Sequence, residues 1–226
     1  MDRILLGRSR TRHQQHSLGR EHSLAADRAA ADPVGSAVTA PSIAILGLPG
    51  SGKGTQSQLL SQTLGLPRIP PGELLRAEIG KDSDLGRQAA TAVTSGIPVA
   101  DAIIFELVDR VIPADRPSIL DGFPADPGQA SWLLAHPAMA TTTLVALHLV
   151  VPPQVAAARL LGRSHTQARA DDTAEIIEKR LNRSRTAVTQ TVSYLQDRAS
   201  VVIVDGEGQP SDVNDAIVAA LSPFLP

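Results

Sequence analysis

The 226-residue sequence predicts a doubly wound α/β fold built around a parallel sheet. Two observations support this prediction. From residue 42 onward, short apolar stretches of strand length alternate with longer stretches of helical periodicity. The first apolar stretch, Ser42–Leu46, runs directly into the glycine-rich segment Gly47–Gln56, which is followed by leucines at helical spacing. Such an alternation favours parallel strands joined by right-handed crossovers.

Each further element is predicted from its own pattern. Three more buried strands are expected at residues 117–120, 143–151 and 200–204. A second strand near residues 66–69 is expected to be short and at an edge of the sheet, because Pro67, Pro70 and Pro71 each lack a ladder donor. Helices are expected at residues 54–64, 73–79, 84–94, 101–111, 127–134, 153–161, 171–198 and 211–221.

The composition excludes several classes of protein. Hydrophobic residues make up 42% of the chain and charged residues 19%, which is enough for a full core. The net charge of −2 gives no electrostatic reason to expect nucleic acid as a partner. The absence of cysteine excludes disulfides and suits a cytoplasmic protein. The most apolar run, residues 144–151, is too short to cross a bilayer, so we expect no membrane partner.

The first 40 residues differ from the rest of the chain. Five arginines and no acidic residue occur between Arg3 and Arg20, and hydrophobic periodicity is weak. An organellar transit peptide, a disordered tail or a start codon assigned too far upstream would each give this composition, and we favour a disordered tail over targeting. We therefore expect a disordered or targeting-like tail at residues 1–40 and one domain at residues 41–226.

The segment Gly47–Gln56 has the residues that a phosphate cradle needs. Its glycines allow successive backbone N–H groups to point inward, and the following helix adds its positive N-terminal end. Lys53 supplies a full charge for the outer phosphates. In the common pattern Ser or Thr follows the lysine directly, whereas here Gly54 intervenes before Thr55. A glycine-rich turn without a ligand is the alternative, but the combined strand, glycines, lysine and helix favour phosphate binding.

An aspartate and four arginines extend the candidate site. Asp121 ends a predicted strand, where a carboxylate beside a phosphate loop holds Mg²⁺; an ordinary Asp-Gly turn is the alternative. Arg159, Arg163, Arg169 and Arg180 follow later in the chain. Guanidinium groups clamp phosphates well, although exposed arginines on solvated helices are also common. Spacing alone leaves both readings of the arginines open.

Together, the Gly47–Gln56 loop, the Asp-Gly-Phe-Pro sequence at residues 121–124 and the arginines resemble the adenylate kinase family of nucleoside monophosphate (NMP) kinases. The resemblance covers about four fifths of the chain, from Ser42 onward. It implies a P-loop NTPase fold with three αβα layers and a five-stranded parallel sheet. It further implies helical NMP-binding residues at 70–100 and a short lid at residues 163–169. The implied activity is direct in-line phosphoryl transfer from Mg²⁺-bound ATP to AMP by a monomeric enzyme.

The resemblance also implies roles for individual residues. The implied catalytic residues are Lys53, Arg163, Arg169 and Arg180. The implied ATP-binding residues are Gly47, Pro49, Gly50, Ser51, Gly52, Lys53, Gly54, Thr55, Gln56, Arg159, Arg163 and Gln209. The implied NMP-binding residues are Gly72, Arg76, Val99, Gly122 and Gln129, with Gln129 reading the acceptor adenine. Asp121 and Thr55 are the implied Mg²⁺ ligands.

Two departures from the family pattern both lie on the monophosphate side. Ala125 stands where the family has an arginine that grips the acceptor phosphate, and Pro70-Pro71 stands where Ser-Thr is usual. Loss of a bidentate arginine contact costs ~2–4 kcal/mol, or ~30- to 1,000-fold, unless a neighbour such as Arg87 or Arg116 compensates. Three functions therefore stay open: a working NMP kinase, the same fold with another phosphate acceptor, and a weakened regulatory homologue.

Overall fold

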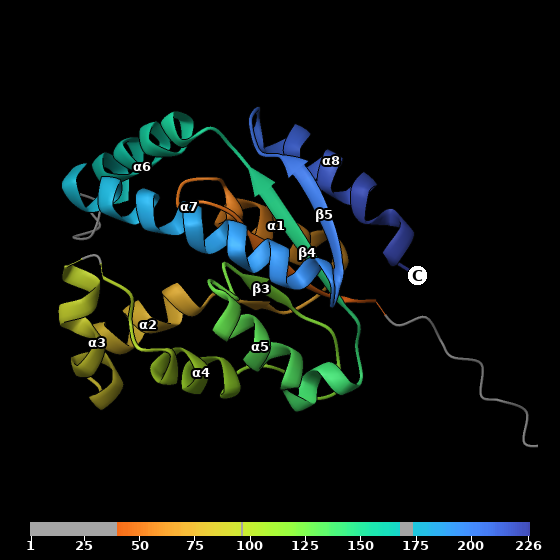
Figure 1. Cartoon of the computed structure of the whole chain (residues 1–226), viewed down its shortest axis with the longest axis horizontal. Helices are drawn as coiled ribbons and strands as arrows, with labels where there is room; N and C mark the ends of the chain where they lie inside the picture. Colours follow the sequence, from red (N-terminus) through yellow and green to blue (C-terminus); the bar gives the residue numbers. More distant parts are fainter. Residues whose placement is uncertain (1–39, 96, 168–173) are drawn as a thin grey trace, which may run out of the picture. The chain divides into compact units, whose positions relative to one another are not determined.

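The computed structural model describes residues 40–95, 97–167 and 174–226, and these residues form a five-stranded parallel sheet with helices on both faces (Figure 1). The strand order is β2-β3-β1-β4-β5. The strands are β1 (Ser42–Leu46), β2 (Arg68–Ile69), β3 (Ile119–Asp121), β4 (Leu144–Val150) and β5 (Ser200–Asp205). The predicted α/β class and the five-stranded parallel sheet are confirmed. The predicted tail, residues 1–40, lies almost wholly outside the described residues.

The strand β2 is short and lies at one edge of the sheet, as the prolines around it predict. It has two residues and pairs only with β3, with Arg68 opposite Ile119 and Ile69 opposite Leu120. The long side chain of Arg68 reaches past Ile119 to the carboxylate of Asp121, the last residue of β3. This edge of the sheet therefore brings two charged residues from distant parts of the sequence together.

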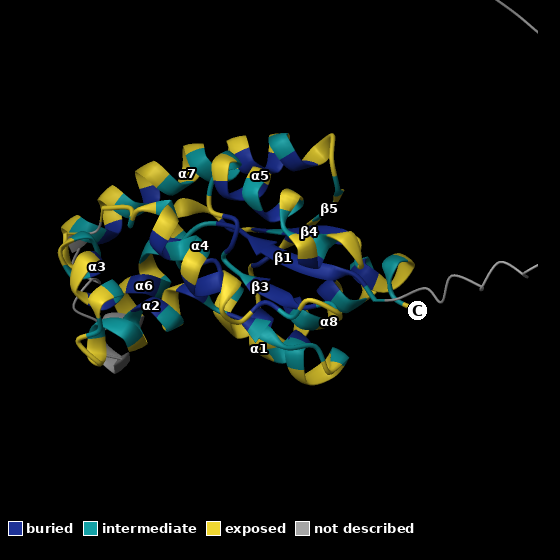
Figure 2. Cartoon of the chain, turned by 90° about the horizontal axis from the view of Figure 1, so that it is seen from below, coloured by how far each residue is buried: buried dark blue, intermediate teal, exposed yellow. Residues whose placement is uncertain are grey.

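Side-chain alternation along the strands divides the core into two layers. On one face, Ala44 and Leu46 pack with the helices α4, α5 and α7. On the other face, Ile43 and Ile45 pack with α1 and α8. These helices are α1 (Lys53–Leu64), α4 (Asp101–Asp109), α5 (Pro127–Ala135), α7 (Ala174–Gln196) and α8 (Pro210–Leu221). Figure 2 shows the buried strands between the two sets of helices, which confirms the three-layer αβα arrangement.

The helices α2 (Pro71–Gly80) and α3 (Asp84–Thr94) extend this framework beside β2. They share a small apolar core with α4, formed by Leu75, Ala89, Ile103 and Leu107. Short 3₁₀ helices also occur at Pro137–Ala140 and Ser222–Phe224. None of the described helices has both the length and the apolar character needed to span a membrane.

The helix α6 (Pro153–Gln167) is longer than the predicted helix at residues 153–161. Residues 163–167 of the expected lid are therefore helical, whereas the periodicity had suggested a connection there. Arg169 and the predicted beginning of α7 at residue 171 lie outside the described residues. α6 packs against α7 through an apolar cluster that includes Ala156, Leu160, Ile177 and Leu181.

We expect Gly86→Ala to destabilise the packing of α3 on α2. A Cβ at Gly86 would lie 2.2 Å from the backbone oxygen of Glu78, and the backbone there cannot move without shifting α2. Alanine gains about 1 kcal/mol of helix propensity, but the overlap forces rearrangements that cost more than this gain. The net loss of ~1–2 kcal/mol should lower Tm by several degrees in a thermal melt.

Gly80→Ala is the matched control for this prediction. Gly80 ends α2, and no heavy atom lies within 4 Å of its ideal Cβ position. This substitution should leave Tm unchanged or raise it slightly. Equal melting temperatures for the Gly86 and Gly80 variants would contradict the steric argument.

Candidate active site

The loop between β1 and α1 adopts the tight path that its glycines allow. Gly47, Gly50 and Gly52 have φ values of +147°, +83° and +100°, where side chains other than glycine are strained. Space is also limiting, since a Cβ at Gly50 would lie 2.4 Å from the backbone oxygen of Ala156 in α6. The loop therefore needs glycine both for its backbone conformation and for its close contact with α6.

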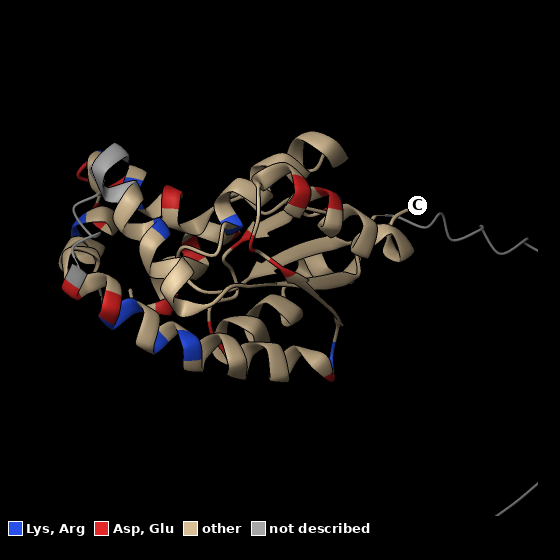
Figure 3. Cartoon of the chain, turned by 90° about the horizontal axis from the view of Figure 1, so that it is seen from above, with Lys and Arg blue, Asp and Glu red and all other residues tan. Residues whose placement is uncertain are grey.

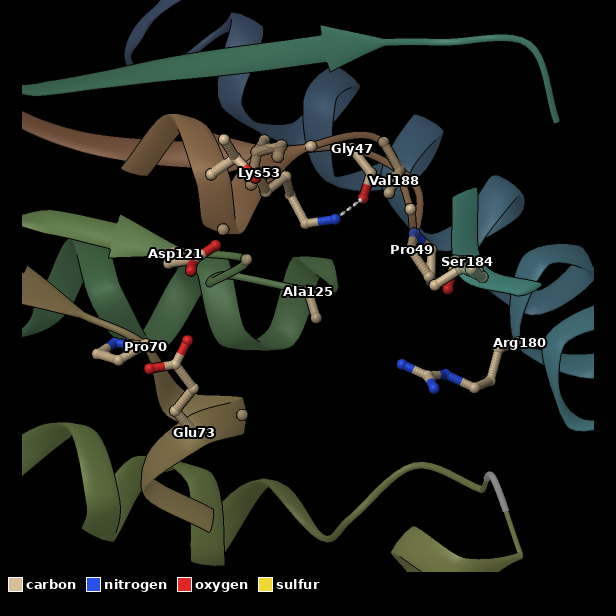
Figure 4. A pocket seen from close by; sticks show the side chains of 18 of the residues that line it. Gly47, Pro49, Lys53, Pro70, Glu73, Asp121, Ala125, Arg180, Ser184 and Val188 are labelled. Carbon is tan, nitrogen blue, oxygen red and sulfur yellow. Dashed lines mark hydrogen bonds between the residues drawn. The ribbon is translucent and has the colours of Figure 1, made fainter. Parts of the chain in front are cut away.

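This loop forms one wall of a cavity of about 640 Å³, a volume typical of small-molecule sites. The other walls come from β2, α2, the end of β3, α6 and α7 (Figure 4). The cavity thus collects residues from five separate segments of the chain, within residues 46–58, 68–76, 121–125, 159–160 and 180–191. Of the residues expected in the site, the following line it: Gly47, Pro49, Gly50, Gly52, Lys53, Gly54, Thr55, Gly72, Arg76, Asp121, Gly122, Arg159 and Arg180.

Lys53 is the first residue of α1 and points toward the loop that precedes it. Its Nζ donates to the backbone oxygens of Gly47 at 2.8 Å and Leu48 at 2.7 Å (Figure 4). Its charge is therefore held at the mouth of the cradle. The phosphates of a bound nucleotide can draw the ammonium group away from these two carbonyls, because a charged acceptor binds it more strongly.

Three of the expected arginines line the cavity from different sides. Arg159 of α6 donates to the backbone oxygen of Gly206 at 3.0 Å and to that of Ser51 at 3.4 Å, so it joins α6 to the loop and to the segment after β5. Arg180 of α7 extends into the cavity from the wall opposite Glu73 (Figure 4). Arg76 of α2 lies close to Gly72, where a Cβ would be 3.5 Å from its Nη1.

Other expected site residues do not line the cavity. The side chain of Gln56 donates to the backbone oxygen of Pro210 at 2.9 Å and accepts from Asn214 at 3.1 Å, so it joins α1 to α8. Gln129 is buried; its Oε1 accepts from the backbone N–H of Ala125 at 2.8 Å. Its Nε2 donates to Asp101 at 2.7 Å. Contact of Gln129 with an acceptor base therefore requires that these hydrogen bonds change.

The remaining expected residues are spread more widely. Ser51 is buried in the loop, and its hydroxyl has no hydrogen-bond partner in the part of the chain that the structure describes. Val99 packs beside the core of α2, α3 and α4, and Gln209 is exposed just before α8. The Arg163 side chain and Arg169 lie outside the described residues.

Ala125 lines the cavity and is exposed, so its small side chain leaves open space there. Neither arginine considered as a replacement lines the cavity. Arg87 lies on α3 and pairs with Asp82 and Asp84, and Arg116 is exposed in the loop before β3. Sequence reasoning missed Arg68, Glu73, Ser184, Val188 and Thr191, which do line it.

The cavity residues fit a magnesium ion. No group of three or more His, Cys, Asp or Glu residues within the described ranges could hold a metal ion alone. Mg²⁺ at nucleotide sites nevertheless needs only one or two protein oxygens, because substrate phosphates and water supply the others. The Asp121 carboxylate and the Thr55 hydroxyl, both oxygen donors, line the same cavity.

His148 of β4 lies opposite Leu46, the last residue of β1 before the loop, and its ionisation affects stability. Burial lowers the pKa of His148 below its ordinary 6.5, and the charge of Lys53 lowers it further. The unfolded chain therefore takes up this proton near pH 6.5 while the folded protein does not. Stability from the neutral histidine is complete above pH 6.5 and is lost as the pH falls toward its folded pKa.

We accordingly expect His148→Gln to weaken the acid sensitivity of the fold. Urea unfolding at pH 7.5 and 5.5 measures the free energy of unfolding of both proteins at each pH. The loss between the two pH values should be smaller in the variant, because glutamine binds no proton. An equal loss in both proteins would show that His148 does not contribute to the pH dependence.

A parallel α/β sheet whose first strand leads into a glycine cradle, with lysine at the start of the next helix, defines a P-loop nucleotide-binding protein. Comparison with known proteins identifies the branch. The adenylate kinase family model matches residues 45–200. An adenylate kinase of Xylella fastidiosa is 36% identical over 188 residues, covering 79% of this chain and 98% of the relative.

Relatives from other bacteria agree. An adenylate kinase of Gloeobacter violaceus is 35% identical, over 75% of this chain and 93% of its own. One of Kocuria rhizophila is 37% identical, over 78% of this chain and 96% of its own. The chain therefore belongs to the adenylate kinase family, and it is a phosphotransferase.

Proposed function

We propose that this protein is an ATP-dependent nucleoside monophosphate kinase that transfers the terminal phosphoryl group of ATP directly to AMP, giving two ADP. The observation that carries the proposal is the shared cavity: the phosphate cradle and Arg76 of α2 line one space. Two substrates bound on opposite sides of this space would meet near Lys53. A shared cavity favours direct transfer without a covalent enzyme intermediate, because both substrates can bind together.

In this proposal the residues divide between the two nucleotides. Lys53 and the loop backbone hold the outer phosphates of ATP, while Arg159, beside Gly206, lies at the adenine. Arg180, with Arg163 and Arg169 of the proposed lid at residues 163–169, stabilises the charge of the transferred group. Gly72, Val99, Gly122 and Gln129 belong to the proposed NMP site, with Arg76 on the acceptor phosphate. Asp121 and Thr55 would hold Mg²⁺, which when bound neutralises charge on the phosphates.

The first alternative is that the protein has the same fold but phosphorylates an acceptor other than AMP. Ala125 offers no charge to an acceptor phosphate, and Pro70 supplies neither a hydroxyl nor a backbone N–H at the start of α2. An acceptor with a differently placed phosphate would suit such a site. A catalytically weakened regulatory homologue is the remaining possibility.

A coupled assay of ADP formation separates these functions. The purified protein, expected to be a monomer, is given Mg²⁺, ATP and in turn AMP, CMP, UMP, GMP and dAMP. We expect AMP to give the highest kcat/KM. A higher value for another monophosphate would assign the second acceptor, and the absence of turnover with every monophosphate, together with ATP binding by calorimetry, would favour the regulatory function.

A further inference from the structure

Arg68 lines the cavity, and its guanidinium group makes four hydrogen bonds there. Its Nε donates to the Ser57 hydroxyl at 2.6 Å. Its Nη1 and Nη2 donate to the two carboxylate oxygens of Glu73 at 3.0 and 2.7 Å, and Nη2 also donates to Asp121 Oδ2 at 2.5 Å. Four of the five N–H donors of the guanidinium are thus engaged. The group is therefore fixed between two carboxylates.

The surroundings strengthen this bridge. The side chains of Arg68 and Asp121 are only 18% and 11% exposed, so solvent screens their attraction weakly. Burial by itself lowers the pKa of Arg68, but hydrogen bonds to Glu73 and Asp121 outweigh it and the pKa is raised. Most other charged residues lie on helices and loops (Figure 3), whereas Arg68 and Asp121 lie on neighbouring strands of the sheet.

The bridge also lies directly against the start of α1. A Cβ at Gly54 would be 3.6 Å from Asp121 Oδ2 and 3.8 Å from Arg68 Nη2. Gly54 stands between Lys53 and Thr55, where the helix N-terminus meets the cavity. The positive charge of the Arg68 guanidinium therefore lies on the side of the cradle where Asp121 and Thr55 offer oxygen ligands for a divalent cation.

A guanidinium and a divalent cation at Asp121 Oδ2 compete for the same negative charge. The two cations also repel each other at contact distance, so the presence of one weakens the binding of the other. We propose that Arg68 competes with the divalent cation for Asp121 and Glu73, and so keeps metal from binding until a nucleotide brings its phosphates. The negative charge of the phosphates then attracts both the Arg68 guanidinium and the divalent cation, so that Arg68 can release Asp121.

The test measures metal binding without turnover. Electron paramagnetic resonance of Mn²⁺ gives the fraction of free ion during titration of the nucleotide-free protein. We expect weak Mn²⁺ binding to the unaltered protein and binding tighter by about tenfold or more for Arg68→Gln, since one competing charge is gone. The double variant Arg68→Gln/Asp121→Asn should lose this gain. Circular dichroism confirms that each variant is folded.

Arg180→Gln is the matched control. It removes the same charge from the same cavity, but from the wall opposite Glu73 (Figure 4). Equal gains for Arg68→Gln and Arg180→Gln would mean that only the net charge matters and would overturn the proposal. Unchanged Mn²⁺ affinity in Arg68→Gln would also overturn the proposal. If, in addition, KM for AMP rises in this variant, Arg68 binds the acceptor phosphate instead.

The inference rests on the proposed function, because it takes the cavity to be a nucleotide site. The test of the inference does not depend on that function. Mn²⁺ binding is measured with no nucleotide and no reaction. A protein inert with every monophosphate can still show the predicted gain, and an active kinase can still lack it. The two failures are therefore distinguishable.

Discussion

Lys53→Ala is expected to abolish phosphoryl transfer while leaving the protein folded. Lys53 is the residue whose full charge lies at the mouth of the cradle, held there by the carbonyls of Gly47 and Leu48. Alanine keeps the helix but removes the charge that offsets the outer phosphates in the transition state. We expect kcat to fall by more than about 1,000-fold, the scale seen when a preorganised charge is removed from a water-excluded site.

The coupled assay of ADP formation measures this loss, and a thermal melt tests folding. Lys81→Ala is the control, since Lys81 is 70% exposed, follows α2 and does not line the cavity. It removes the same charge from the chain and should leave kcat unchanged. If Lys53→Ala keeps most of the activity, the reaction does not occur at this cradle and the proposed site is wrong.

Features with local causes could be predicted from the sequence. The strand Ser42–Leu46, the glycine loop and the helix beginning at Lys53 are adjacent in the chain, so hydrophobic pattern and glycine positions are enough to place them. The edge position of β2 follows in the same way, because the prolines beside it cannot complete a central ladder. In both cases the deciding interactions lie within a few residues.

Features that depend on distant contacts could not be predicted. Arg68 is held by Glu73, five residues away, and by Asp121, 53 residues away, and no spacing rule relates the three. The hydrogen bond of Gln129 to Asp101 spans 28 residues and depends on how α4 and α5 pack. Such contacts follow from the assembled fold, which periodicity does not contain.

The prediction of the length of α6 was wrong for a different reason. Residues 162–167 are polar and carry no apolar stripe, so the pattern ends at Leu161. The helix nevertheless continues through Gln167. Once a helix is nucleated, each added residue gains a backbone hydrogen bond whatever its side chain faces. Hydrophobic periodicity therefore ends at Leu161, although the helix continues to Gln167.

Ala125→Arg is expected to raise kcat/KM for AMP by about one to three orders of magnitude. Ala125 is exposed in the cavity, so a longer side chain has room, and Figure 4 shows it between Lys53 and Arg180. Its backbone N–H is held by Gln129 Oε1 at 2.8 Å, which fixes where the new side chain begins. A guanidinium there can join Arg76 in a bidentate grip on the acceptor phosphate.

The gain should be specific to the acceptor and to the charge. KM for ATP should not change, because Lys53 and Arg159, the residues proposed to bind ATP, are untouched. Ala125→Met fills similar space without charge and should give no gain, so a rise in both variants would indicate packing instead of phosphate binding. No change with Ala125→Arg would mean that a cation already present, such as Arg68, serves the acceptor. If the substitution lowers turnover of another monophosphate while AMP stays poor, the small residue at position 125 is part of a site for that other acceptor.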